Sequence, residues 1–180
     1  MQNQNTKKLA YAALFLALCL VLPMLTGQIP QIGSMLLPMH IPVLLCGLVC
    51  GWQYGAAVGF VAPLLRSVLF GMPPMYPVAI AMAFELLTYG LVIGLVYRRM
   101  AQKGAAGVYA ALLTAMVAGR LVWGVAEVVL LGLGGKAFTA QAFLAGALLN
   151  AVPGIIVQLI LIPAVMAALQ KAGAVKQYAE

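Results

Sequence analysis

Long apolar segments alternate along the chain with short breaks made of glycine, proline and basic residues. Six such segments can be followed, at residues 9–25, 35–50, 55–70, 77–97, 108–131 and 142–169. Each has roughly the length that an α-helix needs to cross the hydrocarbon core of a bilayer, about 20 residues. The pattern therefore predicts an all-α fold, a polytopic membrane bundle of six transmembrane helices, and the length allows a single domain over residues 1–180.

The breaks predict how neighbouring helices turn and pack. Residues 51–54 begin with a glycine and predict a tight turn, whereas Pro73 and Pro74 end the third segment because a helix interior does not accept proline. Glycines also recur every four residues, at Gly47, Gly51, Gly55 and Gly59. Small residues at this spacing let backbones approach closely in lipid. We expect a tight helical hairpin in this region.

Composition supports the membrane assignment. Hydrophobic residues make up 65% of the chain and charged residues 7%, whereas about 25% of the residues of a soluble domain are charged. So few charged side chains cannot cover the surface of a soluble fold of this size, and apolar residues must therefore face lipid. Six helices also leave no segment long enough for a soluble catalytic domain.

The basic residues are distributed unevenly among the breaks. With a cytoplasmic N-terminus, the inner segments hold Lys7, Lys8, Arg98, Arg99, Lys103, Lys171 and Lys176, and the outer loops hold only Lys136. Because cytoplasmic loops carry the excess of Lys and Arg, both termini are expected on the cytoplasmic side. The net charge of +7 is scattered among short clusters, so no nucleic-acid partner is expected.

The N-terminal segment and the cysteines carry no further chemistry. Lys7 and Lys8 before an apolar run resemble the start of a secretory signal, but the bulky Leu18 before Cys19 does not suit a lipoprotein cleavage site, so we expect a retained first helix. Cys46 and Cys50 lie four residues apart with no histidine or carboxylate close in sequence, and we interpret them as small packing residues. No metal site and no cofactor are predicted. The chain also lacks a phosphate-binding loop, so it cannot hydrolyse ATP alone.

Four ionisable residues lie inside the predicted helices: Arg66, Glu85, Arg120 and Glu127. Each costs at least a few kcal/mol at the bilayer centre unless it is paired or hydrated, so such residues are candidates for function. Arg120 is expected near the middle of the membrane, and almost all of the other unusual polar residues fall in its outer half, including His40 at the entry to the second helix and Asn150 in the sixth. Side chains that only held helices together would have no reason to gather in one leaflet.

One face of the fifth helix offers a set of groups suited to a small polar ligand. Arg120, Trp123, Gly124 and Glu127 follow the spacing i, i+3, i+4, i+7 and therefore share that face. They supply a cation, an aromatic ring, a gap and a carboxylate, which suits a zwitterion or a molecule with a carboxylate. Two structural alternatives remain open, an ion pair between Arg120 and Glu127 and another between Arg66 and Glu85. His40 is equally compatible with a polar cap at the membrane interface.

Two stretches of the sequence resemble a known family. Residues 13–17 match an AxxxA pattern through Ala13 and Ala17, and residues 37–45 read Leu-Pro-Met-His-Ile-Pro-Val-Leu-Leu ahead of the glycine series. Together with the basic pair before the first helix, this order resembles the substrate-binding (S) components of energy-coupling factor (ECF) vitamin transporters. The resemblance extends over essentially the whole chain.

The resemblance implies a function and a set of partners. It implies high-affinity capture of a water-soluble vitamin on the outer face, followed by delivery through toppling within the lipid bilayer. The implied partners are a transmembrane coupling subunit, which docks on Ala13 and Ala17, and two cytoplasmic ATPases. The loops at residues 26–34 and 132–141 would help to close the site. Among vitamins, the pocket chemistry favours pantothenate or a pyridoxine-like compound.

Two other classes of function are compatible with parts of the pattern. A stand-alone secondary transporter would use Glu85 or Glu127 as a proton-coupling carboxylate and would need no ATPase. A membrane-embedded enzyme acting on lipids would need an inward or interfacial cluster of carboxylates or histidines, which the sequence does not show. We therefore expect a transport component rather than an enzyme, located in the plasma membrane of a prokaryote.

Overall fold

The structure is a computed structural model that describes residues 2–25, 36–135, 139, 141, 144–145 and 151–173. Regular structure in these residues is entirely helical. The α-helices that can be bounded within these described residues are α1 (Gln2–Leu25), α3 (His40–Cys50), α4 (Trp52–Phe70), α5 (Ile80–Met100), α6 (Ala105–Leu133) and α8 (Val152–Lys171). A short helical segment, η1 (Met75–Ala79), precedes α5, and a single 3-10 turn, η2 (Ala101–Lys103), joins α5 to α6. The predicted all-α class is confirmed.

Five of the described helices are long and apolar enough to cross a membrane. The exception is α3, whose 11 residues span only about 16 Å at 1.5 Å per residue. Its predicted start at residue 35 is wrong, because Leu37 has a φ of +51° and a right-handed helix cannot continue through that conformation. The backbone N–H of His40 donates to the Leu37 carbonyl, and α3 begins there.

The predicted four-residue turn at 51–54 is also wrong, because only Gly51 separates α3 from α4. This residue has φ +98° and ψ 168°, a conformation that glycine adopts without the steric penalty of a side chain. A single residue therefore reverses the chain, and α4 begins at Trp52, three residues earlier than predicted. The helical hairpin itself is confirmed.

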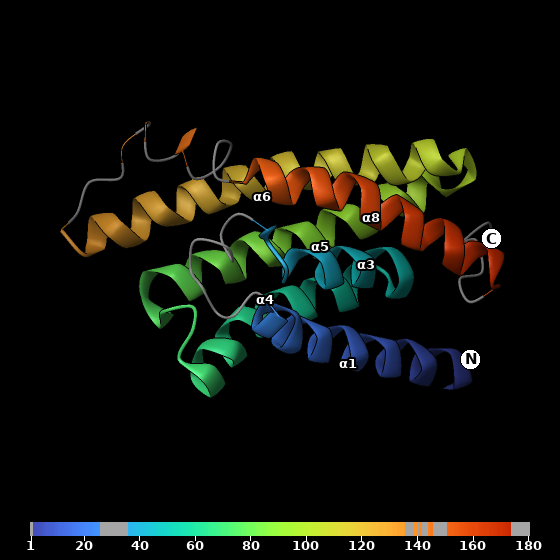
Figure 1. Cartoon of the computed structure of the whole chain (residues 1–180), viewed down its shortest axis with the longest axis horizontal. Coiled ribbons are helices and arrows are strands. Elements are labelled where there is room, and N and C mark those ends of the chain that lie inside the picture. Colours follow the sequence, from blue (N-terminus) through green and yellow to red (C-terminus); the bar gives the residue numbers. More distant parts are fainter. Residues whose placement is uncertain are drawn as a thin grey trace.

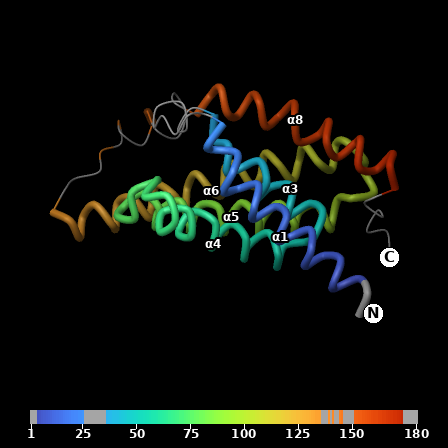
Figure 2. Tube along the Cα trace, turned by 60° about the horizontal axis from the view of Figure 1, so that its bottom comes forward, coloured from blue at the N-terminus to red at the C-terminus, as the bar shows by residue number. Residues whose placement is uncertain are grey.

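Consecutive helices run in alternating directions along the long axis of the molecule (Figure 1). As a result, α1 begins and α8 ends at the same end, which we call the termini end, and Figure 2 shows the same arrangement from another side. The opposite end, towards which α4 and α6 run, is called the loop end. At the termini end, the Gln170 side chain donates a hydrogen bond of 3.1 Å to the Tyr97 hydroxyl and so ties α8 to α5.

Glycines bring α3, α4 and α5 into backbone contact. A Cβ on Gly47 or on Gly55 would lie 2.8 Å from the Gly90 carbonyl oxygen, and a Cβ on Gly59 would overlap the Leu86 carbonyl. The predicted close approach of backbones is confirmed for these three glycines. Part of this approach lies within the hairpin, since a Cβ on Gly55 would also lie 2.7 Å from the Gly47 Cα. The other partner is a third helix, α5, which the spacing within the hairpin did not indicate.

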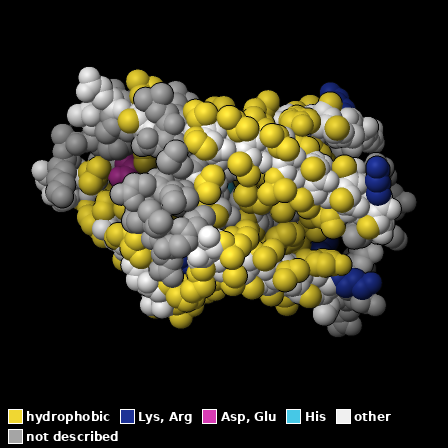
Figure 3. Space-filling model, viewed as in Figure 1, with side chains coloured by type: hydrophobic (Ala, Val, Ile, Leu, Met, Phe, Trp, Pro, Cys, Tyr) yellow, Lys and Arg dark blue, Asp and Glu magenta, His cyan; other side chains and the backbone are white. Residues whose placement is uncertain are grey.

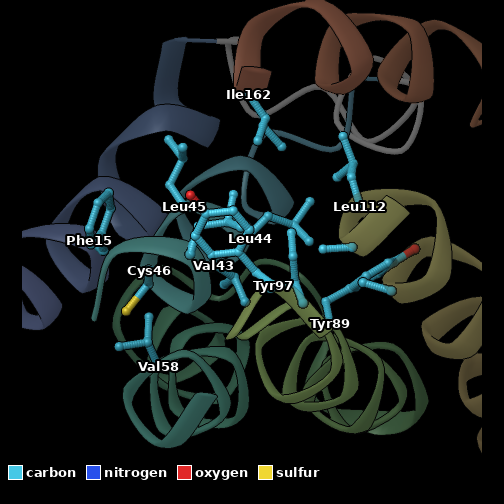
Figure 4. Packing of buried hydrophobic residues seen from close by; sticks show 14 of the residues in the cluster. Phe15, Val43, Leu44, Leu45, Cys46, Val58, Tyr89, Tyr97, Leu112 and Ile162 are labelled. Atoms are coloured by element: carbon cyan, nitrogen blue, oxygen red, sulfur yellow. The ribbon is translucent and has the colours of Figure 1, made fainter. Parts of the chain in front are cut away.

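Apolar side chains from all six helices fill the centre of the bundle (Figure 4). Phe15 of α1, Leu44 of α3, Val58 of α4, Leu112 of α6 and Ile162 of α8 contribute to one cluster, together with Tyr89 and Tyr97 of α5. On the outer surface, apolar side chains form a broad band, and Lys and Arg gather mainly at the termini end (Figure 3). An apolar surface band of this kind is expected where a protein contacts the hydrocarbon core of a bilayer.

Candidate functional site

Three polar side chains from three helices meet inside the bundle. The carboxylate oxygen Oε1 of Glu85, on α5, lies 3.0 Å from Nη1 of Arg120 on α6. The same oxygen lies 3.4 Å from Nε2 of His40 on α3. The side chains of Glu85 and His40 are 2% exposed and that of Arg120 is 13% exposed. We call these three residues the ionic cluster.

The local packing of α5 against α6 positions this cluster. Tyr89 follows Glu85 by one helical turn, and its ring lies against Gly119, the residue before Arg120. The same ring stands edge-on to the His40 imidazole, with 5.2 Å between the ring centroids. The ring of Tyr89 is buried, at 2% exposed, and packs against α6 at a residue that has no side chain. Because Gly119 leaves room for the ring, α6 comes close enough to α5 for Arg120 to reach Glu85.

The ionic cluster leaves several polar atoms without a hydrogen-bond partner among the described residues. These atoms are Nε and Nη2 of Arg120, both ring nitrogens of His40 and Oε1 of Glu85. Arg120 and Glu85 form an ion pair and His40 makes a close polar contact with Glu85, and neither contact is an aligned hydrogen bond. The amide nitrogen of Gln158, on α8, is also buried without a partner. Buried polar groups in native proteins are nearly always paired, so an unpaired set indicates a site that awaits a ligand or water.

Trp123 and Glu127 extend the site towards the loop end of α6. The Arg120 guanidinium carbon lies 5.9 Å from the centre of the Trp123 ring. Glu127 is two turns further along the helix and is buried, at 7% exposed. Arg120 pairs with Glu85 on the neighbouring helix, so the considered ion pair between Arg120 and Glu127 is not the one observed.

Arg66 is buried separately, between α4 and α1. Its Nη1 donates a hydrogen bond of 2.5 Å to the Leu20 carbonyl, and its guanidinium carbon lies 5.3 Å from the centre of the Phe70 ring. The considered pair between Arg66 and Glu85 is therefore wrong: Arg66 donates to a carbonyl of α1 five residues before the end of that helix, and Glu85 contacts Arg120 instead. Arg66 anchors the neighbouring helix rather than joining the ionic cluster.

The remaining expected site residues lie largely outside the described residues. This holds for Asn150, for the loop at residues 26–34, and for residues 136–138 and 140 of the loop at 132–141.

Two residues that sequence reasoning missed are Tyr89 and Gln158. Gln158 had a usable signal, because an amide within an apolar segment indicates a special role by the same argument that selected Asn150.

A further contact ties the loop end together. The Tyr76 hydroxyl, in the connection between α4 and α5, donates to the Leu130 carbonyl near the end of α6. A Cβ built on Gly134, just beyond α6, would lie 3.4 Å from the same hydroxyl. The connection therefore rests on α6 at the same end of the bundle as Glu127.

These features define a class of protein: a multi-pass helical membrane protein with a buried ionic cluster between its helices. A family model described as "ECF transporter, substrate-specific component" matches residues 7–166. The match extends over most of the chain, and the protein belongs to this family of ECF transporter substrate-specific components. No curated protein and no solved structure matches the chain.

Family membership establishes the role in outline. Substrate-specific components capture a small molecule for transport and are not enzymes. They associate with an ECF coupling subunit and ATPases. Five long apolar helices agree with such a multi-pass membrane protein. The family resemblance expected from the sequence is thus confirmed.

Proposed function

We propose that this chain captures a small water-soluble vitamin or vitamin precursor in an outward-facing pocket formed around the ionic cluster. The observation that carries this proposal is the set of buried polar atoms on Arg120, His40 and Gln158 for which the described part of the chain offers no hydrogen-bond partner. In a membrane interior such atoms cost folding free energy unless a partner arrives, and a substrate supplies one. Pantothenate and pyridoxine-like compounds are the favoured classes.

The other predicted residues take supporting roles in this proposal. Trp123 offers an aromatic face beside Arg120, and Glu127 offers a second carboxylate nearer the loop end. Arg66 holds α1 against α4 at the border of the pocket. Asn150 and the loops at residues 26–34 and 132–141 contribute to closing the pocket over the bound substrate.

The proposed topology is a single domain, residues 1–180, with six membrane crossings and both termini in the cytoplasm of a prokaryotic cell. Two features support it. Helices α1 and α8 have their terminal ends at the same end of the molecule, and basic side chains gather there, including Lys7, Arg98, Arg99 and Lys171. Cytoplasmic flanks of membrane proteins carry such an excess of Lys and Arg.

Docking on the coupling subunit is proposed to use the exposed face of α1. Ala13 and Ala17 are exposed, whereas Ala12, Phe15 and Cys19 turn inward and pack on the core. Small residues on an exposed helix face let another helix approach closely in lipid. In the complex, toppling of the whole bundle would carry the occupied pocket towards the cytoplasm.

Replacing Ala13 and Ala17 with tryptophan is expected to abolish assembly with the coupling subunit and the ATPases while leaving substrate affinity within about twofold. The large rings hold the partner helix away, and the ionic cluster lies on other helices. Co-purification measures assembly, and ligand-induced thermal shift measures binding. Tryptophan at Leu113 and Val117, on the exposed face of α6, is the matched control. Retained assembly of the α1 variant would place the docking face elsewhere.

Uptake into proteoliposomes tests the proposed energy source. Vesicles with the chain alone are expected to show no accumulation of substrate, and vesicles with coupling subunit, ATPases and internal ATP are expected to accumulate it. Accumulation by the chain alone, driven by an imposed proton gradient and lost on Glu85→Gln or Glu127→Gln, would contradict the proposal. It would identify a stand-alone proton-coupled secondary transporter instead.

A further inference from the structure

We propose that the substrate carries a carboxylate group and that the Nε–Nη2 edge of Arg120 binds it. This inference rests on the proposed capture function and narrows it to one chemical class, the monocarboxylic acids. It also separates the two favoured substrates, because pantothenate is a carboxylic acid and pyridoxine is not.

The geometry of the guanidinium group is the first argument. Its N–H donors lie in one plane and point in fixed directions. Nη1 faces Glu85 at 3.0 Å, while Nε and Nη2 are buried and have no partner among the described residues. Nε and Nη2 form one edge of the group, with two parallel N–H bonds. Such an edge matches the two oxygens of a carboxylate, which it binds through a pair of hydrogen bonds.

The chemical type of the unpaired atoms is the second argument. The guanidinium nitrogens of Arg120 and the amide nitrogen of Gln158 are donors only. Gln158 lies on α8, which packs against both α3 and α6, the helices that carry His40 and Arg120. The one carboxylate oxygen among the unpaired atoms, Oε1 of Glu85, is already approached by Arg120 and His40. A ligand that pairs with Arg120 and Gln158 must therefore bring acceptors. A cationic ligand would find Glu85 already opposed by Arg120 and His40.

The position of Glu127 limits the ligand to one carboxylate near Arg120. Glu127 is seven residues further along α6, which corresponds to about 10 Å along the helix axis. A carboxylate on the Arg120 edge is therefore closer to the cation than to this second anion. A dicarboxylate reaching along α6 would meet Glu127 and be repelled, whereas a hydroxyl or an amine in that place would be accepted.

A purely structural role for Arg120 leaves these atoms unexplained. An arginine kept only to balance Glu85 needs Nη1, yet its other edge is also buried, and buried donors without partners destabilise a fold. A lysine would balance Glu85 without presenting a second edge. A carboxylate of the substrate bound at the Nε–Nη2 edge would explain why this position holds an arginine rather than a lysine.

The test compares acids with their neutral analogues on the purified full-length protein in detergent. Thermal shift and titration calorimetry are measured with pantothenate and pantothenol, nicotinate and nicotinamide, 4-pyridoxate and pyridoxine, and biotin and its primary amide. The acid of one pair is expected to bind about 100-fold more tightly than its neutral analogue, since a site built around hydrogen bonds rejects analogues that cannot make them.

Two variants connect the acid preference to the proposed atoms. Arg120→Lys keeps the charge but loses the edge, and the affinity for the acid is expected to fall at least tenfold while the neutral analogue is unaffected. Gln158→Leu removes a donor without touching the ionic cluster and should lower the affinity several-fold. Arg99→Lys, an exposed position at the termini end, is the matched control and should change nothing. Gel filtration confirms that each variant remains folded.

The outcomes separate this inference from the function on which it rests. Tight binding of a neutral compound, or equal binding of acid and analogue, would overturn the carboxylate assignment and leave substrate capture intact. Equal loss of acid and neutral binding in Arg120→Lys would show a structural arginine and likewise overturn the assignment. If no compound binds the folded protein, both proposals fail. Should Arg120→Lys not fold, the comparison of acid with analogue on the unmodified chain decides alone.

Discussion

Replacing Glu85 with alanine is expected to destabilise the folded protein by about 3–5 kcal/mol, because breaking a buried ion pair leaves an uncompensated charge. Arg120 and His40 both contact this carboxylate, and all three side chains are largely buried. Removing it leaves the guanidinium in an apolar interior with no anion beside it. Thermal unfolding in detergent, followed by intrinsic fluorescence, measures the loss, and substrate binding should be lost in parallel.

A double variant distinguishes the loss of charge balance from the loss of packing. Glu85→Leu combined with Arg120→Met removes both charges at similar volume, and such replacements are often neutral or stabilising. The double variant is therefore expected to recover the stability of the unmodified protein yet bind no substrate. If the double variant is as unstable as Glu85→Ala, the loss of stability comes from altered packing rather than from an unbalanced charge. If it binds substrate normally, the ionic cluster is not the binding site.

Replacing Gly90 with alanine is expected to lower stability by at least about 3 kcal/mol, the upper end of the cost of overpacking a core. The added Cβ would overlap the Gly55 backbone and lie 2.7 Å from the Ala56 nitrogen. Backbone atoms at such a helix contact cannot move aside as the end of a flexible side chain can. Roughly 6–12 °C should be lost from the melting temperature of the purified protein, at 2–4 °C for each kcal/mol.

Gly132 provides the matched control for this substitution. It lies in the last turn of α6, and a Cβ built there meets no atom within 4 Å. Alanine at this position is expected to leave the melting temperature unchanged or to raise it slightly, since alanine favours a helix more than glycine does. A similar loss from both substitutions would show that helix propensity, and not the contact between α4 and α5, explains the effect at Gly90.

The glycine contact also matters for function. Because α3 and α4 are joined by Gly51 alone and both pack on α5 through glycines, these three helices form a closely packed unit. His40 begins α3, and Glu85 lies on α5 directly before Leu86, whose backbone contacts Gly59 of α4. The unit therefore fixes two of the three members of the ionic cluster relative to each other. Binding sites on rigid elements hold their geometry with little ordering on binding.

The sequence alone predicted the helical class and which residues are unusual, because both follow from the chemistry of a bilayer. Glu85, Arg120 and Glu127 were identified as costly in lipid; Glu85 and Glu127 are buried, and the side chain of Arg120 is 13% exposed. Their pairing was not predictable, because it depends on which helices are neighbours and how each is rotated about its axis. Sequence spacing reports one face of one helix, and the partner of Arg120 lies on another.

The boundaries of the hairpin show a second limit. The start of α3 depends on the backbone conformation of Leu37, and the turn after it depends on a single glycine with positive φ. Neither conformation is visible in an apolar pattern, which continues through both positions. The glycine series did predict close packing, because the absence of side chains is a property of the sequence itself. Which helix fills the space is decided only by the fold.

The most direct test of substrate capture is a thermal-shift screen of water-soluble vitamins and their precursors against two proteins, the unmodified chain and the Glu85→Leu, Arg120→Met double variant. A ligand at 100 times its dissociation constant adds about 2.7 kcal/mol to the stability of the protein that binds it. We expect one compound to raise the melting temperature of the unmodified chain and to leave the double variant unchanged. A compound that stabilises both proteins equally, or a screen in which none stabilises the unmodified chain, would contradict capture at the ionic cluster.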